Sequence, residues 1–248
     1  RLMGRSWPYL VLLLPPLFWA GNFIVGRAFS AELGAITMSF YRWLLALCLL
    51  APLAYSRVRQ ELPIILNHLP ILTVLALLSV ASFNVLLYLG LRDTQATNAL
   101  LINSSIPVWI VLFGVLFYND SLTLRRGLGI LVSLLGVSFL IFSGLLLAIN
   151  PLDEAPLPMT LDTLYAVGYV AIFASLGAYV CWNYGVGQLG AQAAGQYIHL
   201  MPFYGVLLAS LFLNESLSYH HWVAGGLIAT GLILALRQSP HALASKSN

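Results

Sequence analysis

Eight apolar stretches follow one another along this chain, and each is close to the roughly 20 residues that an α-helix needs to cross a bilayer. Only 8% of the residues are charged and 60% are hydrophobic, whereas a soluble domain carries about 25% charged residues. We therefore expect an all-α polytopic membrane protein. The predicted spans are Pro8–Val25, Ile36–Ala54, Leu69–Leu91, Ala96–Tyr118, Leu128–Phe142, Leu164–Val186, Ala191–Leu213 and Trp222–Leu236.

The composition also narrows the possible partners. The net charge of +3 is not gathered into a basic patch that could follow a phosphate backbone, so we expect no nucleic-acid partner. Cys48 and Cys181 each lie alone in an apolar stretch, without the spacing of a metal site. We expect a lipid bilayer and a small-molecule substrate as partners, no metal and no cofactor. A monomer is expected, with a dimer as the alternative.

The basic residues predict the orientation. Cytoplasmic loops of membrane proteins carry an excess of Lys and Arg. When the N-terminal end is placed inside, Arg27 and Arg92 fall near outer span ends. Eight basic residues then lie on the inner side: Arg1, Arg5, Arg57, Arg59, Arg125, Arg126, Arg237 and Lys246. We therefore expect both termini to face the cytoplasm.

Part of the chain is repeated. A shift of 95 residues superimposes two long stretches without a gap, which is the signature of an internal duplication. The matching pairs are Gly90 with Gly185, Pro107 with Pro202, Asn119–Leu122 with Asn214–Leu217, and Gly136 with Gly231. The repeated motif is a helix pair with a proline in its first helix and a turn of Asn followed by an acid.

The two copies differ in length. We assign residues 1–143 to a first five-helix repeat and residues 144–248 to a second, which has only residues 144–162 where a two-helix hairpin is expected. A five-helix unit repeated in tandem inserts with opposite topology, as in secondary transporters with inverted repeats. The expected architecture thus has ten transmembrane helices, about eight of them in this chain. We expect the intact protein to hold about forty more residues near Gly144, with a true deletion as the alternative.

Several motifs resemble a known family. These are Phe18–Phe23 followed by Gly26–Arg27, the segment Phe40–Ala46, and the doubled pattern of proline, Asn-acid turn and glycine. They are similar to the EamA type of the drug/metabolite transporter superfamily, and the whole chain looks like its YddG-type exporters of aromatic and other amino acids. The resemblance implies two inverted repeats, a central cavity, alternating access, and a place in the bacterial inner membrane.

Polar side chains within spans indicate where a substrate could bind, because they usually face a bundle interior or a water-filled cavity. Gln192, Gln196 and His199 recur on one face of a predicted helix. The alternative for this face is a seam of interhelical hydrogen bonds. The other candidates are the amides, hydroxyls and aromatic rings of further spans: Trp19, Asn22, Asn84, Tyr88, Asn103, Ser104, Tyr179 and Trp182.

We expect the prolines and arginines inside the spans to have structural roles. Pro15, Pro16, Pro107 and Pro202 are expected to kink helices, although a kink also frees carbonyl groups that can line a cavity. Arg27 and Arg42 lie near outer span ends, where long side chains can reach the headgroups; a substrate role for either is the alternative.

The distribution of charge separates the possible functions. No Asp or Glu is predicted at the middle of a span, which disfavours a proton-coupled pump for organic cations. Buried basic clusters of the kind that a nucleotide-sugar exchanger needs are not evident, and no catalytic motif indicates an intramembrane enzyme. We therefore predict a transporter, with no catalytic residues, for small metabolites such as apolar and aromatic amino acids. Other transporters of the superfamily and an intramembrane enzyme are the alternatives.

Overall fold

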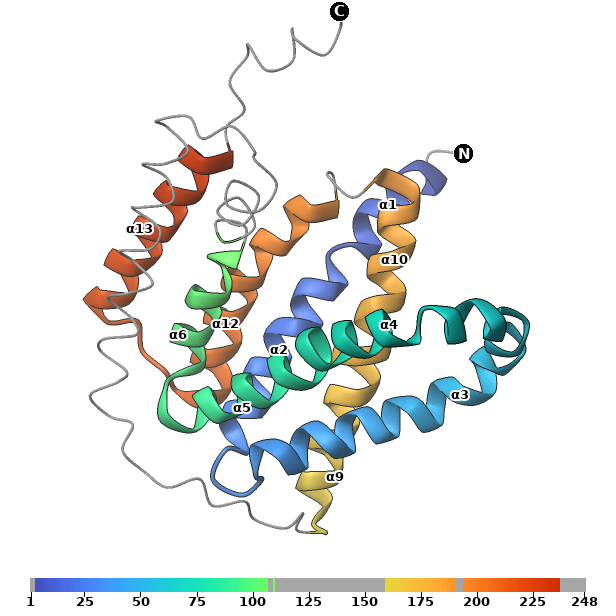
Figure 1. Cartoon of the computed structure of the whole chain (residues 1–248). Helices are drawn as coiled ribbons and strands as arrows, with labels where there is room; N and C mark the ends of the chain where they lie inside the picture. The colour runs from blue at the N-terminus through green and yellow to red at the C-terminus, as the bar shows by residue number, and fades with distance from the viewer. Residues whose placement is uncertain (1–2, 107–108, 110–158, 191–193, 237–248) are drawn as a thin grey trace, which may run out of the picture. The chain divides into compact units, whose positions relative to one another are not determined.

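The computed structural model describes residues 3–106, 109, 159–190 and 194–236, and within these ranges every regular element is a helix. This confirms the all-α class (Figure 1). The elements are α1 (Met3–Val11), α2 (Leu14–Ala28), α3 (Ala35–Asn67), α4 (Leu69–Ala76), η1 (Leu77–Ser82), α5 (Phe83–Asp93), α6 (Ala96–Asn103), α9 (Leu161–Tyr169), η2 (Val170–Gly177), α10 (Ala178–Leu189), η3 (Gln196–Leu200), α12 (Met201–Leu213) and α13 (Tyr219–Leu236).

Four helical stretches within the described ranges are long and apolar enough to cross a membrane. They are Ser6–Ala28, Ala35–Asn67, Leu161–Leu189 and Gln196–Leu213. Each overlaps a span predicted from the sequence, so the polytopic membrane class is confirmed. The predicted span Leu128–Phe142 lies outside the described residues, as does most of the junction proposed between the two repeats.

The chain divides into two compact units, which are described separately. The first comprises residues 1–99 and 150–215. Helix α2 is its central element, since it packs most extensively against α12 and also against α5, η2 and α10. In Figure 1 the blue α2 runs between α12 and α10. Because α12 and α10 come from the second half of the sequence, α2 joins the two halves.

The first span is interrupted just before Pro15 and Pro16. Helix α1 ends at Val11, and α2 begins at Leu14 with Pro15 and Pro16 in its first turn. Proline is tolerated there because the first N–H groups of a helix have no acceptor within the helix. Pro202 takes the same place in the first turn of α12, directly after the 3₁₀ turn η3. Pro107 lies outside the described residues.

Two glycines allow neighbouring side chains to approach α2 closely. A Cβ atom on Gly26 would lie 2.8 Å from Leu91 Cδ1 and 2.9 Å from the ring of Tyr88, both on α5. A Cβ atom on Gly21 would lie 2.8 Å from Tyr169 Cζ on α9. Small residues at helix interfaces permit this approach in membranes, where van der Waals packing drives association.

We expect Gly26→Val to lower the free energy of unfolding by about 1–3 kcal/mol, because overpacking displaces buried neighbours. Gly90→Ala, on the facing helix α5, is the matched control, since a Cβ atom there meets nothing within 4 Å. This control should be neutral or stabilising by up to about 1 kcal/mol, because alanine favours helix over glycine. Thermal unfolding in detergent would measure both variants, and equal melting temperatures for Gly26→Val and the wild type would contradict the packing argument.

Two π-helical turns occupy equivalent places in the sequence repeat. A shift of 95 residues carries η1 onto residues 172–177, which lie within η2. In each turn a serine hydroxyl donates to the carbonyl five residues earlier, Ser82 to Leu77 and Ser175 to Val170, both at 2.8 Å. Such turns often occur at functional sites. The internal repeat found in the sequence therefore extends to the backbone geometry.

The second span is longer than predicted. The predicted end was Ala54 with a loop after it, whereas α3 continues to Asn67. This boundary was wrong because Arg57, Arg59 and Glu61 are good helix formers despite their charge, and the helix continues through them and on through Pro63.

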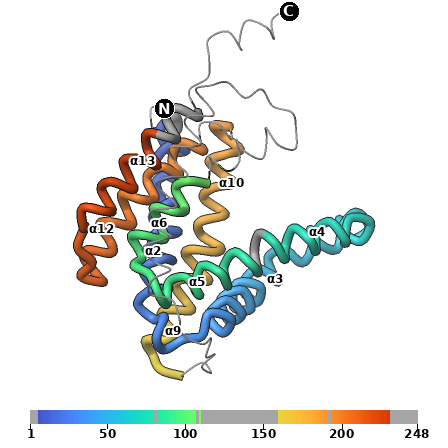
Figure 2. The backbone as a smooth tube through the Cα atoms, turned by 60° about the vertical axis from the view of Figure 1, so that its left-hand side comes forward, coloured from blue at the N-terminus to red at the C-terminus, as the bar shows by residue number. Residues whose placement is uncertain are grey.

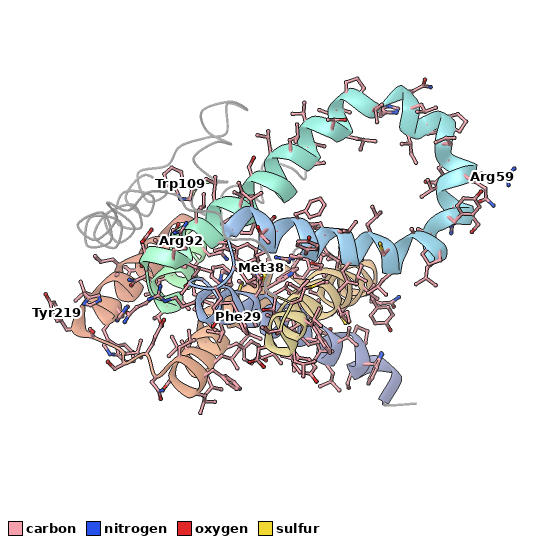
Figure 3. All side chains as sticks on the ribbon, turned by 90° about the horizontal axis from the view of Figure 1, so that it is seen from below. Phe29, Met38, Arg59, Arg92, Trp109 and Tyr219 are labelled. Atoms are coloured by element: carbon pink, nitrogen blue, oxygen red, sulfur yellow. The ribbon has the colours of Figure 1, made fainter. Side chains whose placement is uncertain are left out.

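The far ends of α3 and α4 extend together away from the packed part of the first unit, as Figure 2 shows. In Figure 3, Arg59 lies at the far end of α3, whereas Met38 lies in the packed part. Helix α4 has no buried residue. Its apolar side chains are suited to contact with lipid.

The second unit comprises residues 100–149 and 216–248, of which α13 and the end of α6 are described. Ala224 and Ile228 of α13 are buried against Leu101 and Ile102 of α6. A Cβ atom on Gly225 would approach Leu101 Cδ2 to 3.4 Å. Small residues on α13 thus favour close packing of these two helices within the unit.

Candidate functional site

A buried arginine organises the polar interior of the first unit. Arg42 of α3 is only 3% exposed. Its Nε atom donates to Ser175 Oγ at 2.7 Å. Its Nη1 atom donates to Asn84 Oδ1 at 2.6 Å, Tyr88 Oη at 2.9 Å and Asn22 Oδ1 at 3.0 Å. The Tyr88 hydroxyl also donates to Asn22 Oδ1 at 2.7 Å, which closes the network.

Four helical segments supply these groups. Asn22 comes from α2, Arg42 from α3, Asn84 and Tyr88 from α5, and Ser175 from the π-helical turn η2. Asn84 and Tyr88 share one face of α5 because they are four residues apart. All five side chains are buried. The network thus links helices from both halves of the sequence.

The partners of Arg42 are all uncharged. Asparagine, tyrosine and serine oxygens surround the guanidinium, and among the described residues no carboxylate pairs with it. A cation buried in a membrane protein is costly unless it is paired or hydrogen-bonded. The prediction that Arg42 reaches toward the headgroups is wrong. Its position on α3 directs it into the helix bundle, where amides and hydroxyls satisfy it.

An aromatic cluster lies beside this network. The ring of Trp19 on α2 is 5.8 Å from Tyr179 and 5.6 Å from Trp182, both on α10, measured between ring centroids. Tyr179 is 46% exposed and the two tryptophans are partly exposed, so the cluster presents open ring surface. Edge-to-face and tilted arrangements of this kind are favourable for aromatic rings.

The polar network and the aromatic cluster are one helical turn apart. Trp19 precedes Asn22 by three residues on α2, and Tyr179 follows Ser175 by four residues on the helix that packs against α2. Residues at these spacings lie on the same helix face, about 5 Å apart along the axis. Along α2, and along the continuous segment of η2 and α10, about one helical turn therefore separates the aromatic rings from the polar network.

The predicted stripe on the ninth helix is only partly described. Gln196 and His199 lie in η3, a 3₁₀ turn rather than the α-helix expected. They still share a face, since a 3₁₀ turn repeats every three residues. His199 is half-buried and Gln196 exposed, and η3 packs against α2, which carries Trp19 and Asn22. Gln192 lies outside the described residues.

Asn103 and Ser104 belong to the second unit. The Ser104 hydroxyl donates to the Leu100 carbonyl of its own helix at 2.8 Å. This hydrogen bond satisfies the hydroxyl locally.

Two charged side chains bind helix ends in the first unit. Arg27 donates to the carbonyls of Leu91 at 2.8 Å and Arg92 at 2.7 Å, at the end of α5. Arg27 itself is only partly buried, so its interaction with headgroups stays a prediction. Glu215 accepts the N–H groups of Ala96 at 2.9 Å and Thr97 at 3.1 Å, and the Thr97 hydroxyl at 2.8 Å. Each charge complements the dipole of the helix end that it binds.

Sequence reasoning missed the centre of the network, although it selected Asn22, Asn84 and Tyr88. Arg42 was assigned from its depth in the predicted span alone. A better signal was its helix face, because Ser39, Arg42 and Ala46 are small or polar residues on one face, whereas their neighbours Phe40, Tyr41 and Leu44 are large and apolar or aromatic. In the structure the first three are buried and the last three are exposed. Ser175 had no comparable signal, because its role depends on the π-helical turn.

Comparison with known proteins identifies the family. The model of the EamA-like transporter family matches residues 6–143 and again residues 137–237, so the family unit occurs twice. An uncharacterized transporter from Archaeoglobus fulgidus is 24% identical over 284 aligned positions that cover 93% of this chain and 97% of that protein. One from Methanothermobacter thermautotrophicus is 22% identical, covering 94% and 87%. The uncharacterized transporter YyaM of Bacillus subtilis is 20% identical, covering 65% and 71%.

No solved structure matches the chain. The doubled family match, the membrane-spanning helices and the transporter relatives agree with one another. They describe a multi-pass membrane transporter with a small-molecule substrate. The chain belongs to the EamA-like transporter family.

Proposed function

We propose that this transporter moves small zwitterionic metabolites, in particular amino acids with apolar or aromatic side chains, by alternating access. The observation that carries the proposal is the stacking of two layers in the first unit. The Arg42 network offers charged and polar hydrogen-bonding groups, and the rings of Trp19, Tyr179 and Trp182 lie one helical turn away. An amino acid joins a polar head to a side chain over a comparable distance.

The charge of the site supports this substrate class over other substrates of the superfamily. An organic cation would need a buried carboxylate, whereas the described site holds a buried arginine. A nucleotide sugar carries several phosphate charges and would need clustered basic groups, whereas Arg42 is the one basic side chain in the described network. A carboxylate head with an apolar side chain fits one cation and an aromatic wall.

We further propose that the chain lies in a bacterial inner membrane with both termini in the cytoplasm, and that it works as an exporter or facilitator. The support for orientation is the excess of basic residues at one set of span ends. The resemblance to YddG-type exporters supports the export direction.

The repeat boundary at residues 143 and 144 and a hairpin missing near residues 144–162 are also proposals. The Archaeoglobus fulgidus alignment supports a missing segment, since it extends over 284 positions although the whole chain has 248 residues. That relative therefore contains residues without a counterpart here.

Counterflow of labelled tryptophan in proteoliposomes tests the proposed function. We expect wild-type counterflow, and a loss of about tenfold or more for Trp19→Ala, because a substrate ring loses its main stacking partner. Trp7→Ala is the matched control, since Trp7 on α1 is 57% exposed and should act only as an interface anchor.

The same assay tests His199, which we expect to act by hydrogen bonding. His199→Gln should keep appreciable counterflow, and His199→Leu should lose most of it. No counterflow for any amino acid in a panel would reject the proposal.

A further inference from the structure

We infer that Arg42 binds the carboxylate of the substrate, and that this carboxylate is required for recognition whereas the ammonium group is dispensable. The inference rests on the proposed transport of amino acids and narrows it to one chemical group. It also extends the expected substrates to organic acids that carry an aromatic or apolar tail.

The guanidinium of Arg42 does not use all of its donors equally. An arginine has five N–H groups. The one on Nε binds Ser175, and the two on Nη1 are shared among Asn22, Asn84 and Tyr88. Among the described residues, the two on Nη2 have one partner, the Ala174 carbonyl, at the long distance of 3.5 Å. Nη2 therefore has the capacity to bind a further acceptor, such as a ligand oxygen.

The next residue, Trp43, also carries a hydrogen-bond donor that could bind a ligand. The indole Nε1 of Trp43 is buried and has no hydrogen-bond partner in the part of the chain that the structure describes. The guanidinium carbon of Arg42 lies 5.2 Å from the centroid of the Trp43 ring. A buried N–H group without an acceptor costs about 1–3 kcal/mol. Trp43 Nε1 thus has no acceptor among the described residues, and Arg42 Nη2 has only the distant Ala174 carbonyl. A carboxylate has two oxygens that accept hydrogen bonds.

The positive charge of Arg42 also favours an anionic ligand. Burying a cation among neutral groups leaves an electrostatic cost that an anion would relieve. The neighbouring amides and hydroxyls hold the guanidinium in place before any ligand arrives. A carboxylate entering the site would then form a charge-assisted pair with a pre-oriented arginine, which is the geometry that favours strong binding.

The same site offers nothing comparable to an ammonium group. In the part of the first unit that the structure describes, the side chains of Glu32, Glu61, Asp93 and Asp162 are exposed. Glu215 is the remaining acid there, and it binds the start of α6. Acceptors for an ammonium group would be neutral oxygens and aromatic faces alone. Its removal should therefore change affinity much less than removal of the carboxylate.

Competition against tryptophan counterflow by two matched analogues tests the inference on the wild-type protein. Indole-3-propionate is tryptophan without its ammonium group, and tryptamine is tryptophan without its carboxylate. We expect indole-3-propionate to compete within about tenfold of tryptophan, and tryptamine to be at least about hundredfold weaker, because the site would leave buried donors unpaired. If tryptamine competes as well as indole-3-propionate, the inference is wrong although the proposed function stands.

Variants of Arg42 provide the second readout. Arg42→Lys keeps the charge but loses the planar fork, so it should retain part of the discrimination between the two analogues. Arg42→Gln should lose it, so that the two analogues compete equally. If Arg42→Gln does not fold, the wild-type competition still decides. Unchanged discrimination in folded Arg42→Gln would overturn the inference, and failure of the wild type to exchange any amino acid would overturn both this inference and the proposed function.

Discussion

Replacement of Asn22 by Asp is expected to raise the melting temperature of the protein and to abolish transport. Asn22 Oδ1 accepts hydrogen bonds from Arg42 Nη1 at 3.0 Å and from the Tyr88 hydroxyl at 2.7 Å. Aspartate has nearly the same shape. It turns the bond from Arg42, which already has a charged donor, into an ion pair, and the bond from Tyr88 into a charge-assisted one. A hydrogen bond to a charged group contributes about 1.5–3 kcal/mol, against about 0.5–1.5 kcal/mol for a neutral pair. A stabilisation of about 1 kcal/mol is therefore expected.

The opposite effect on transport follows from the same charge. An internal carboxylate would neutralise Arg42 and repel the carboxylate of the substrate, so we expect a loss of at least about hundredfold in tryptophan counterflow. Asn67→Asp at the exposed end of α3 introduces the same charge away from the network and should change neither property much. Thermal unfolding in detergent and counterflow would be measured on the same preparation. A destabilised Asn22→Asp variant with normal transport would contradict both the network geometry and the role of Arg42.

Replacement of Glu215 by Ala is expected to destabilise the protein by about 2–3 kcal/mol, because two backbone N–H groups and one hydroxyl at the start of α6 lose a charged acceptor together. The carboxylate also complements the positive end of the helix dipole. Glu215→Gln keeps the shape and one acceptor oxygen, so its effect should lie between those of the wild type and the Ala variant.

Glu32→Ala is the matched control for this position. Glu32 is an exposed acid in the turn between α2 and α3, and its removal should cost less than about 0.5 kcal/mol. Thermal unfolding of all three variants measures the effect. If Glu215→Ala melts with the wild type, the carboxylate is not a significant cap of α6. Glu215 is also the acid in the second copy of the duplicated Asn-acid turn.

The membrane class, the approximate positions of the described spans and the internal repeat could be predicted from the sequence. These properties depend on averages over about 20 residues, because a bilayer requires a long apolar helix whatever its neighbours are. The break before Pro15 and Pro16 was also predictable, since proline disrupts helix hydrogen bonding locally. The end of α3 was not, because charged helix formers after Ala54 continue a helix beyond its apolar part.

The candidate site was predicted only in part. Asn22, Asn84 and Tyr88 could be selected one by one as polar groups inside apolar stretches, and Trp19, Tyr179 and Trp182 as rings at mid-span. Their division into a polar network and an aromatic cluster depends on how α2, α5 and α10 pack, which no single helix specifies. Helical periodicity places a side chain on a face but does not state which other helix lies opposite.

The position of Arg42 shows most clearly what only the tertiary structure decided. By sequence it is an arginine seven residues after the start of α3, close enough to the outer end to reach water by extending its side chain. In the folded chain, helices from both halves of the sequence bring neutral oxygens to its guanidinium, so the charge stays inside. The sequence determined the helices and their approximate depth, because hydrophobicity and proline act locally. Packing decided which charge is buried, because the acceptors that stabilise a buried arginine come from residues up to 133 positions away.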